Sequence, residues 1–524
     1  MKYGQWMTAK DVLRVNALKW PDKTGIKDLN KAYSFKTWNE RACRLANGLA
    51  TMGLRPGDRF AVLAYNCVEW MELYAAAAKG GFVCVPIMFR LAAPEMAYIL
   101  QHSGAKGIVV QGGRELPWID RVRELRKDLP GMDTYISFAA DDSRYEGFVP
   151  YEEVVTGADP GEPDVPVRAD DLWVIMYTGG TTGRPKGVMK SHANLFSQYF
   201  ITIYEQAFEF DDTNLLVMPC CHINSLFYSF VVTWVGGTVM AYNAVSFDPE
   251  NLLKTFSEHG ITFTSLVPTQ YVMLLALPEE IKARYDVSCV TKLLCSSAPA
   301  RRDTKLGILE MFPNARLWEA YGSTEAGMVT ILKPEEQMTK LGSIGREVIG
   351  SDRIRLYDEA GILIEEPGVV GELFSRSPQV FEGYWNEPEK TVEAMNGEYF
   401  SAGDMARRDE DGYYTLVDRK ANMIITGGEN VYPAEVENAV GSHPKVKHVA
   451  VIGTPHKKWG EQVTAVVVLH VGEAATPEEI SSHCRGEIAG YKVPKKVVFI
   501  QEEEMPMSGP GKILHRVLRE RYGR

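Results

Sequence analysis

Apolar and polar positions in the first part of the chain follow a pattern that predicts helices and strands in turn. Between residues 37 and 52, apolar side chains recur with the spacing of one helix face, and the apolar run Phe60–Leu63 follows a turn rich in Gly and Pro. The alternation continues with helices expected at 68–79 and 93–103 and strands expected at 82–86 and 106–110. Strands that alternate with helices of this length favour a parallel sheet covered by helices.

A second series of strands and helices follows residue 208. Strands are expected at 215–218, 236–240, 262–267 and 292–295, and helices at 227–235, 249–259 and 269–277. The two series predict two αβ-layered subdomains. From residue 345 to 381, short runs separated by Gly and Pro indicate a compact β module, which we expect to be a small β-barrel.

The chain becomes basic near Asp418 and then restarts a small αβ pattern. Its strands are expected at 449–452, 464–468 and 497–500. Because 524 residues exceed what one core usually holds, at least two domains are expected. We therefore predict an α/β protein with a large N-terminal domain, residues 1–417, and a small mobile α+β C-terminal domain, residues 418–524.

The bulk composition narrows the class of protein. Hydrophobic content of 45% and charged content of 24% are those of an ordinary globular protein. A net charge of -11 argues against general nucleic-acid binding, and no apolar run is long enough to cross a bilayer. The N-terminus lacks the apolar core of a secretory signal, and the eight cysteines are scattered without a C-x-x-C pair. We expect a cytoplasmic protein with reduced thiols.

The stretch 177–187, with the sequence YTGGTTGRPKG, follows an apolar strand expected at 172–176. Its glycines let backbone N–H groups approach an anion, its threonines add hydroxyl donors, and Lys186 adds a positive charge. It is not a Walker loop, because Lys186 follows proline and precedes glycine rather than Ser or Thr. A solvent loop of small residues would have the same composition, so both interpretations stay open at this point. We expect residues 188–195 to open a helix after the loop.

Five further motifs carry groups suited to a nucleotide or a thin ligand. YGSTE at 321–325 combines an aromatic ring that can stack on a purine with a Thr hydroxyl and a carboxylate that can bind magnesium. SAGD at 401–404 offers an acid for ribose hydroxyls, and DRK at 418–420 supplies fixed positive charge. TGGEN at 426–430 leaves room for a thin ligand, and SGPGK at 508–512 presents a lysine on a flexible loop. Each motif alone also has a purely structural explanation, such as a core Tyr or a surface ion pair.

Taken together and in this order, the motifs resemble those of the adenylate-forming superfamily of acyl- and aryl-CoA synthetases. That superfamily includes firefly luciferase and the adenylation domains of nonribosomal peptide synthetases. The resemblance extends from about residue 33 to residue 516. It implies a two-step reaction that uses ATP, Mg²⁺ and coenzyme A. A carboxylate attacks the α-phosphorus of ATP to give acyl-AMP and pyrophosphate, and the thiol of coenzyme A then displaces AMP.

The resemblance also implies a role for each motif. The β- and γ-phosphates would bind Thr178, Gly179, Gly180, Thr181, Thr182, Gly183 and Lys186. Adenosine and the α-phosphate would contact Ser297, Ala298, Pro299, Glu319, Ala320, Tyr321, Gly322, Ser323 and Thr324, with Tyr321 stacked on adenine. Glu325 would hold the metal ion, Asp404 would bind the ribose with help from Arg419, and His222 would lie beside the substrate carboxylate. Lys512 would bridge that carboxylate and the α-phosphate, and Gly427, Gly428 and Glu429 would line the pantetheine tunnel.

The chemistry that these roles require is mainly electrostatic. A carboxylate is already a nucleophile at neutral pH, so the reaction needs charge neutralisation and alignment rather than a general base. Since Lys512 and the pair Gly427–Gly428 serve successive steps, we expect the small domain to rotate about the segment near Asp418. Two positions depart from the family pattern. Ala421 stands where the hinge usually has Asp or Lys, which puts the polar contacts of the hinge residue in question, and Gly179–Gly180 replaces the common Ser-Gly.

The acid substrate is the least specified feature. The expected pocket wall is apolar with a few polar groups, which favours a hydrophobic medium-chain, alicyclic or aromatic acid. Its members are His222, Asn224, Ser225, Phe227, Tyr228, Val267, Ser296, Ser297, Ala326, Gly327 and Met328. Phe227 and Tyr228 also fit ordinary core packing. Other functions stay open: an enzyme that loads a carrier protein, the same ligase run toward ATP, and a regulatory protein without turnover. The oligomeric state, with a homodimer as one option, is open as well.

Overall fold

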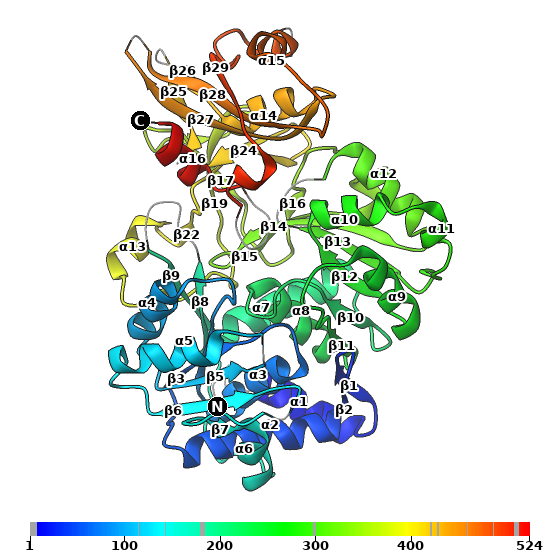
Figure 1. Cartoon of the computed structure of the whole chain (residues 1–524), viewed down its shortest axis with the longest axis vertical. Coiled ribbons are helices and arrows are strands. Elements are labelled where there is room, and N and C mark those ends of the chain that lie inside the picture. Colours follow the sequence, from blue (N-terminus) through cyan, green and yellow to red (C-terminus); the bar gives the residue numbers. More distant parts are fainter. Residues whose placement is uncertain are drawn as a thin grey trace. The chain divides into compact units, whose positions relative to one another are not determined.

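The computed structural model describes residues 8–113, 115–141, 143–178, 184–296, 300–419, 422–426, 429–457, 459–485, 487–507 and 513–523 (Figure 1). The chain packs into two compact units. Unit 1 comprises Met1–Arg353 and Ser375–Phe400, and unit 2 comprises Ile354–Phe374 and Ser401–Arg524. Unit 2 therefore contains the expected small domain together with residues that precede position 418. The domain division at 418 and the rotation about it stay predictions.

An eight-stranded sheet forms the first part of unit 1, in the order β20-β9-β8-β4-β3-β5-β6-β7 (Figure 1). Its strands are Gly383–Tyr384 (β20), Lys186–Ser191 (β9), Leu172–Thr178 (β8), Val83–Pro86 (β4), Arg59–Leu63 (β3), Gly107–Gln111 (β5), Thr134–Phe138 (β6) and Val149–Pro150 (β7). The strands from β8 to β7 run parallel to their neighbours, whereas β9 is antiparallel to both β8 and β20. The predicted alternation of strands and helices in this region is confirmed.

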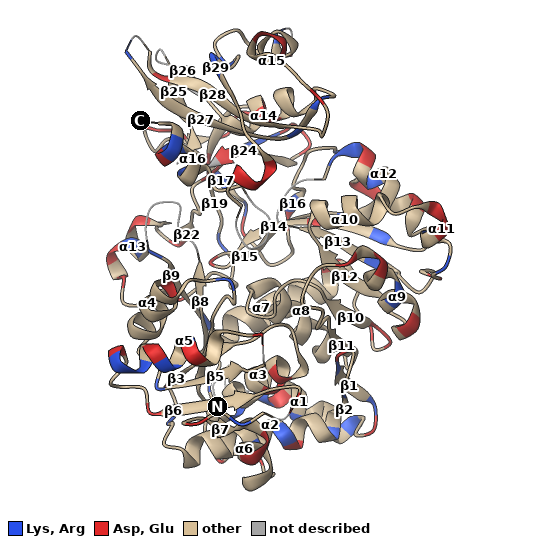
Figure 2. Cartoon of the chain, viewed as in Figure 1, with Lys and Arg blue, Asp and Glu red and all other residues tan. Residues whose placement is uncertain are grey.

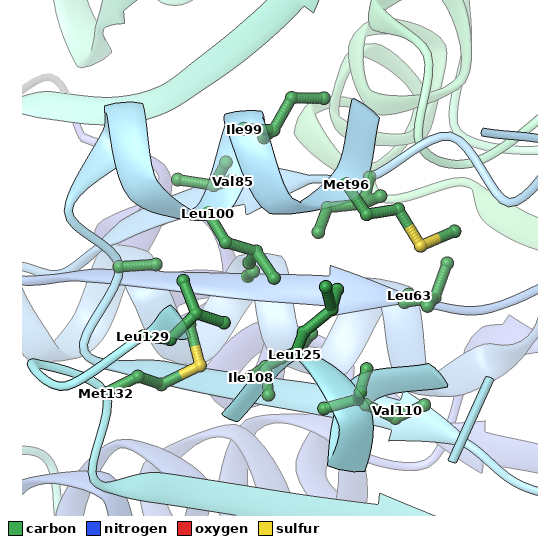
Figure 3. Close-up of a cluster of buried hydrophobic side chains, with 14 of the residues drawn as sticks. Leu63, Val85, Met96, Ile99, Leu100, Ile108, Val110, Leu125, Leu129 and Met132 are labelled. Carbon is green, nitrogen blue, oxygen red and sulfur yellow. The ribbon is translucent and has the colours of Figure 1, made fainter. Parts of the chain in front are cut away.

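The helices of this part bury apolar stripes. They are Ala9–Lys19 (α1), Phe35–Thr51 (α2), Val68–Gly80 (α3), Ala93–Ser103 (α4), Trp118–Leu125 (α5) and Tyr151–Gly157 (α6). In one buried cluster, side chains of α4 and α5 meet side chains of β3, β4 and β5, among them Leu63, Val85, Met96, Ile99, Leu100, Ile108, Val110 and Leu125 (Figure 3). Because helices cover β3, β4 and β5, the buried side chains of these strands are apolar in nearly continuous runs, as the sequence pattern indicates.

A nine-stranded sheet forms the second part of unit 1, in the order β16-β15-β14-β13-β12-β10-β11-β1-β2. Its strands are Arg346–Glu347 (β16), Gly327–Leu332 (β15), Arg316–Ser323 (β14), Lys292–Ser296 (β13), Phe263–Leu266 (β12), Thr213–Leu216 (β10), Thr238–Ala241 (β11), Thr24–Lys27 (β1) and Ala32–Ser34 (β2). The strands from β14 to β1 are parallel to their neighbours, and β15, β16 and β2 are antiparallel additions.

The helices of this second part are His192–Gln206 (α7), Ile223–Trp234 (α8), Pro249–His259 (α9), Pro268–Leu275 (α10), Glu279–Lys282 (α11) and Arg302–Met311 (α12). Unit 1 also contains Pro388–Glu393 (α13) and the short pair Met395–Asn396 (β21) and Tyr399–Phe400 (β22). Charged side chains gather on α11 and α12, whereas α8 carries none (Figure 2). An uncharged helix suits a place between layers, and residues 225–233 of α8 are all buried.

The expected helix that opens at residue 188 is wrong. Residues Lys186–Ser191 form β9, which pairs with β8, and the helix starts only at His192. The Ser191 hydroxyl accepts a hydrogen bond from the backbone N–H of Asn194, and the Asn194 side chain accepts one from the backbone N–H of Ser191. This capping box fixes the start of α7, so the stretch 177–187 connects two antiparallel strands rather than a strand and a helix.

The first sheet of unit 2 has an open strand order, so the expected β-barrel is not confirmed. Its strands are Arg355–Tyr357 (β17), Leu363–Ile364 (β18), Val370–Phe374 (β19), Asp404–Arg408 (β23) and Tyr414–Arg419 (β24), in the order β18-β17-β19-β23-β24. All neighbours are antiparallel, and among the described residues no pairing joins the edge strands β18 and β24.

The second sheet of unit 2 has helices on both faces. Its elements are Ile424–Thr426 (β25), Glu429–Val431 (β26), Pro433–Gly441 (α14), Val446–His456 (β27), Gly460–Leu469 (β28), Pro477–Cys484 (α15), Lys496–Phe499 (β29) and His515–Tyr522 (α16). Neighbouring residues point to opposite faces, since Val451 packs with residues of α14 and α15 while Ala450 and Ile452 pack with Leu518 of α16. The expected α+β pattern of this region, with its three main strands, is confirmed.

Two structural features relate to what the composition led us to expect: the character of the helices and the state of the cysteines. Within the described part of the chain, no helix combines the length and the apolar character that a membrane span requires. The eight cysteines are all free thiols, and seven of them are buried.

Candidate active site

The predicted phosphate loop, residues 178–186, begins and ends in paired strands. β8 ends at Thr178 and β9 begins at Lys186, and the Cα atoms of these two residues are register partners. The pairing brings Thr178 and Lys186, whose hydroxyl and ammonium are predicted to bind phosphate, to the same end of the two strands. The residues between them, Gly179, Gly180, Thr181, Thr182 and Gly183, lie outside the described residues.

The YGSTE motif forms the end of β14 and the turn that leads into β15. Gly327 has a left-handed φ of 74°, and a Cβ added to Gly322 would lie 2.0 Å from the carbonyl oxygen of Gly327, so both positions require glycine. The Ser323 hydroxyl accepts a hydrogen bond from the backbone N–H of Ala326 at 3.0 Å. The tight turn therefore presents Thr324 and Glu325, both half-buried, at the carboxyl end of a central strand.

Glu325 and Lys186, which belong to separate motifs, contact the same tyrosine. The Tyr384 hydroxyl donates a hydrogen bond to Glu325 Oε1 at 3.0 Å. The Lys186 ammonium lies 4.3 Å from the centroid of the Tyr384 ring, within the range of a cation–π contact. Tyr384 is placed there because β20 pairs with β9, opposite Val188. The fold thus brings together the predicted metal-binding carboxylate and the predicted phosphate-binding lysine.

The carboxylate of Glu325 fits a magnesium ion that also binds phosphate. It is a hard oxygen ligand on a half-buried turn, and the hydrogen bond from Tyr384 orients it through one of its two oxygens. In the described residues, no group of three His, Cys, Asp or Glu side chains could form a metal cage. Magnesium is usually bound by one or two carboxylates and completed by water and substrate phosphates, so a single carboxylate beside a phosphate loop is a suitable site.

Glu319 holds the end of another predicted nucleotide-binding segment. Its Oε1 accepts a hydrogen bond from the backbone N–H of Ala300 at 2.8 Å, and its Oε2 lies 2.5 Å from the ammonium of Lys305. Burial raises the pKa of Glu319, although Lys305 acts against that rise. Ser297, Ala298 and Pro299, directly before Ala300, lie outside the described residues, whereas Ala320 pairs with Ser296 across β14 and β13.

Three short polar side chains from three elements form a hydrogen-bonded row beside the start of α8. Asn224 Nδ2 donates to Ser265 Oγ on β12 at 3.1 Å, and Ser265 Oγ lies 3.2 Å from Ser296 Oγ at the end of β13. Asn224 is half-buried, and the two serines are buried. His222 is the N-cap residue of α8, and its Nδ1 accepts a hydrogen bond from the backbone N–H of Asn224 at 3.4 Å.

Aromatic side chains lie one turn further along the same helix. The ring of Tyr228 lies 4.8 Å from the ring of Phe263 and 4.7 Å from the ring of Phe227. The Tyr228 hydroxyl accepts a hydrogen bond from Gln206 Nε2 at 3.1 Å, and burial raises the pKa of Tyr228. Phe263 and Ser265 point to the same face of β12, because they are two residues apart. Polar and aromatic groups of α8 and β12 are thus adjacent. Asn224, Tyr228 and Ser296 belong to the wall predicted for the acid, whereas Phe263 and Ser265 were not predicted.

Unit 2 positions the predicted ribose-binding residues and the predicted hinge. Asp404 and Arg419 are register partners across β23 and β24, and Asp404 is buried. Asp418 Oδ2 accepts a hydrogen bond from the backbone N–H of Ala434, at the start of α14, at 2.8 Å. Outside the described residues lie Lys420, Ala421, Gly427, Gly428 and Lys512, and the side chains of Arg419 and Glu429.

The helix that follows the Lys512 segment is anchored to α14. His515 Nε2 lies 2.6 Å from Glu437 Oε1. Burial lowers the pKa of His515, but the hydrogen bond and the charge of Glu437 outweigh burial, so the pKa lies above its ordinary value. This pair fixes the start of α16 and thus the chain directly after the predicted catalytic lysine.

Beside the predicted phosphate-binding and metal-binding residues, sequence reasoning missed Tyr384, Gln379 and Lys190. Gln379 accepts a hydrogen bond from the backbone N–H of Met328 at 3.0 Å and donates one to its carbonyl at 2.9 Å. Lys190 is fully buried, and burial lowers its pKa to about 7 against the opposing charges of Glu325 and Glu382. In the sequence, Lys190 follows the apolar pair Val188–Met189. A lysine in such a place normally indicates an exposed strand position, so nothing in the sequence indicated that Lys190 is buried.

Comparisons with known protein sequences agree with this geometry. The AMP-binding enzyme family matches residues 13–385, and the AMP-binding enzyme C-terminal domain matches residues 435–512. The chain is 36% identical over 507 residues to a feruloyl-CoA synthase of Amycolatopsis sp, which covers 96% of both proteins. It is 35% identical over 492 residues to the long-chain-fatty-acid–CoA ligase FadD13 of Mycobacterium tuberculosis, which covers 93% of both.

A solved structure with ATP is similar over the whole chain. ATP-bound MatB from Rhodopseudomonas palustris matches with a TM-score of 0.87 and 30% sequence identity, and the match covers 99% of each chain. The family match covers well over half of the chain, and the phosphate-loop strands and the YGSTE turn lie within it. This chain therefore belongs to the AMP-binding enzyme family, the adenylate-forming superfamily of acid–CoA ligases.

Proposed function

We propose that this AMP-forming acid–CoA ligase activates a hydrophobic carboxylic acid, whether aromatic, alicyclic or of medium chain length, and that an aromatic acid with a polar ring substituent fits best. One observation carries the proposal: the wall beside the start of α8 combines packed aromatic rings with the hydrogen-bonded row of Asn224, Ser265 and Ser296.

The aromatic residues of this wall suit the apolar body of such an acid, and its polar residues suit a polar ring substituent. Phe227, Tyr228 and Phe263 are buried and pack on one another, which makes this side of the row apolar, and burial of apolar area is worth about 25 cal/mol per Å². The amide of Asn224 and the serine hydroxyls can donate and accept hydrogen bonds, which suits a hydroxyl or alkoxy substituent. None of these residues carries a positive charge, so a second carboxylate on the substrate would be disfavoured. The name of the feruloyl-CoA relative supports an aromatic acid, and that of FadD13 supports an aliphatic one.

In the first step, a carboxylate oxygen of the acid bonds to the α-phosphorus of ATP, and the bond from that phosphorus to the bridging oxygen breaks as pyrophosphate leaves. We assign Thr324 to the α-phosphate, residues 178–186 to the β- and γ-phosphates, and Glu325 to the metal. Bound magnesium would neutralise phosphate charge. Since both reactants are anions, the chain's own contribution is charge neutralisation and alignment.

In the second step, the sulfur of coenzyme A bonds to the acyl carbon, and AMP leaves with one oxygen of the original carboxylate. We assign Lys512 to the first step only and residues 427–429 to the passage of pantetheine in the second. Tyr321 is assigned to adenine, Asp404 and Arg419 to the ribose, and His222 to the substrate carboxylate. Rotation of the small domain near Asp418 would bring Lys512 to the substrate in the first step and residues 427–429 in the second. Ala421 would supply no polar side chain at this hinge.

Other functions of the same fold remain as alternatives to be tested. A carrier-loading enzyme would transfer the acyl group to a protein-bound phosphopantetheine, and a ligase run in reverse would make ATP from acyl-CoA. A regulatory protein without turnover would not need Lys512, Glu325, Thr324 and Asp404 together, so their presence favours catalysis. Eight free thiols agree with a reducing compartment, and we propose the cytoplasm.

A panel of acids assayed for AMP release tests the substrate proposal. We expect cinnamate, 4-hydroxy-3-methoxycinnamate and octanoate to exceed acetate and malonate by about 100-fold or more in kcat/KM, because they bury more apolar area. AMP release should require free coenzyme A. In Asn224→Leu, the preference for the ring-substituted cinnamate over cinnamate should fall, while the rate with octanoate serves as the control.

Each contrary outcome of the panel identifies a different failure. A highest kcat/KM with acetate or malonate would contradict the hydrophobic acid. Turnover with a phosphopantetheine-bearing carrier protein but not with coenzyme A would favour the carrier-loading enzyme. No AMP with any acid would favour the regulatory protein.

A further inference from the structure

Lys190 differs from the other buried lysines in the groups that it contacts. Among the described residues, three lysines are 0% exposed: Lys79, Lys190 and Lys305. Lys79 pairs with the carboxylate of Glu162, and Lys305 pairs with that of Glu319. The Lys190 head group forms no ion pair with any described carboxylate and donates instead to two backbone carbonyls.

The first carbonyl belongs to Glu325, the residue whose carboxylate we assign to magnesium. Lys190 Nζ lies 3.4 Å from this carbonyl oxygen. The same oxygen accepts a hydrogen bond from the backbone N–H of Phe381 at 2.8 Å. The backbone of Glu325 is therefore held from two directions, while its side chain is oriented by Tyr384.

The second carbonyl belongs to Gln379, which supports the other side of the same turn. Lys190 Nζ lies 2.5 Å from the Gln379 carbonyl oxygen, and the Gln379 side chain bonds both backbone groups of Met328. A Cβ added to Gly327 would lie 2.7 Å from the Cβ of Gln379, so the segment is packed closely against the turn. Through these bonds, one lysine connects both sides of the Thr324–Glu325 turn.

The strand that carries Lys190 also carries the phosphate-loop lysine. Lys186 and Lys190 are four residues apart in β9, and since side chains alternate along a strand, they point to the same face. Lys186 contacts the ring of Tyr384, whose hydroxyl binds the carboxylate of Glu325, and Lys190 contacts the backbone of Glu325. β9 therefore sets the spacing between the phosphate loop and the turn.

Burial of a lysine head group that has no carboxylate within ion-pair distance is unfavourable, and the charges of Glu325 and Glu382 offset the cost of burial only in part. Replacement of buried charged groups by well-packed apolar residues is often neutral or stabilising. The neighbours Val188 and Met189 show that the strand accommodates apolar side chains. A lysine at this position therefore calls for a reason other than stability.

We propose that Lys190 is a positioning residue for the adenylation step: it fixes the backbone of the Thr324–Glu325 turn so that the Glu325 carboxylate keeps its place, with Lys186, at the Tyr384 side chain. This inference rests on the proposed metal-binding role of Glu325. It predicts an effect on the magnesium dependence of acyl-AMP formation and none on the second half-reaction.

The test compares Lys190→Met with Lys79→Met, a matched control at an equally buried lysine outside the site. Three quantities are measured: the free Mg²⁺ concentration that gives half-maximal ATP–pyrophosphate exchange, the rate of thioester formation from supplied acyl-AMP, and Tm. Lys190→Met should raise the half-maximal Mg²⁺ concentration by about 10-fold or more and leave thioester formation within about 2-fold. Lys79→Met should lower Tm and leave the magnesium dependence unchanged.

A second variant, Lys190→Gln, keeps a shorter hydrogen-bond donor and should give a smaller shift; it carries the same test if Lys190→Met does not fold. A wild-type magnesium dependence in the folded variant would overturn the inference, and so would equal losses in both half-reactions. Failure of the proposed function would be seen differently, as the absence of exchange in the wild-type protein with every acid.

Discussion

Lys512→Ala is expected to abolish acyl-AMP formation while largely sparing thioester formation from supplied acyl-AMP. In the first step, two anions must approach each other, and a lysine between the substrate carboxylate and the α-phosphate offsets their repulsion. Loss of such a preorganised charge should lower the ATP–pyrophosphate exchange rate by about 100-fold or more. In the second step, the anhydride already exists and the attacking atom is sulfur, so this lysine has no comparable role.

The two half-reactions are measured separately, by exchange and by thioester formation from synthetic acyl-AMP and coenzyme A. Lys496→Ala removes an exposed lysine from β29 in the same unit and should leave both rates unchanged. Equal losses of the two half-reactions in Lys512→Ala would contradict the assigned role and point to a general effect on unit 2.

Glu325→Gln should lower the exchange rate by about 100-fold and raise the Mg²⁺ concentration needed for half-maximal rate by about 10-fold or more. The substitution removes the charge that attracts the metal but keeps the size of the side chain. It also keeps an oxygen that can accept the hydrogen bond of Tyr384, so the turn itself is preserved. Kinetics of exchange over a range of free Mg²⁺ concentrations checks this result.

Tyr384→Phe provides a graded comparison for the same carboxylate. It removes the hydroxyl that orients Glu325 but keeps the ring beneath Lys186, so a smaller loss of about 10-fold is expected. If Glu325→Gln shows the magnesium dependence of the wild-type protein, the metal is held elsewhere and the assignment of Glu325 is wrong.

Local signals in the sequence predict much of this fold. The bounds of α9, Pro249–His259, agree with the expectation because its ends are marked by residue type. The Asp248 side chain accepts hydrogen bonds from two backbone N–H groups of the first turn, Pro249 occupies the first helical position, and Gly260 adopts a left-handed φ of 60°. For α9, these end signals were sufficient to place both ends of the helix from the sequence alone.

Pairing partners distant in the sequence decide the features that the sequence did not predict. The run after the phosphate loop is a strand because β8 and β20 lie on either side of it, although Ser191 did mark the true start of α7. The open strand order of the first sheet in unit 2 likewise depends on which short strands pair. These are tertiary choices, which local propensity does not fix.

In the candidate site too, some residues could be predicted from local sequence and others only from tertiary contacts. The sequence motifs predict Lys186, Thr324 and Glu325 because glycine and hydroxyl residues cluster around them. Tyr384, Gln379 and Lys190 reach the site only through the pairing of β20 with β9 and through hydrogen bonds to the turn. Their residue types are ordinary in isolation, so contacts rather than composition identify them.

The central claim is that one acyl-adenylate links the two half-reactions. It is tested most directly by supplying an acid labelled with ¹⁸O in both carboxylate oxygens, together with ATP, Mg²⁺ and coenzyme A, and by locating the label by mass spectrometry. We predict one ¹⁸O atom in each AMP, one in the thioester and none in pyrophosphate. AMP without label, or label in pyrophosphate or inorganic phosphate, would contradict the account.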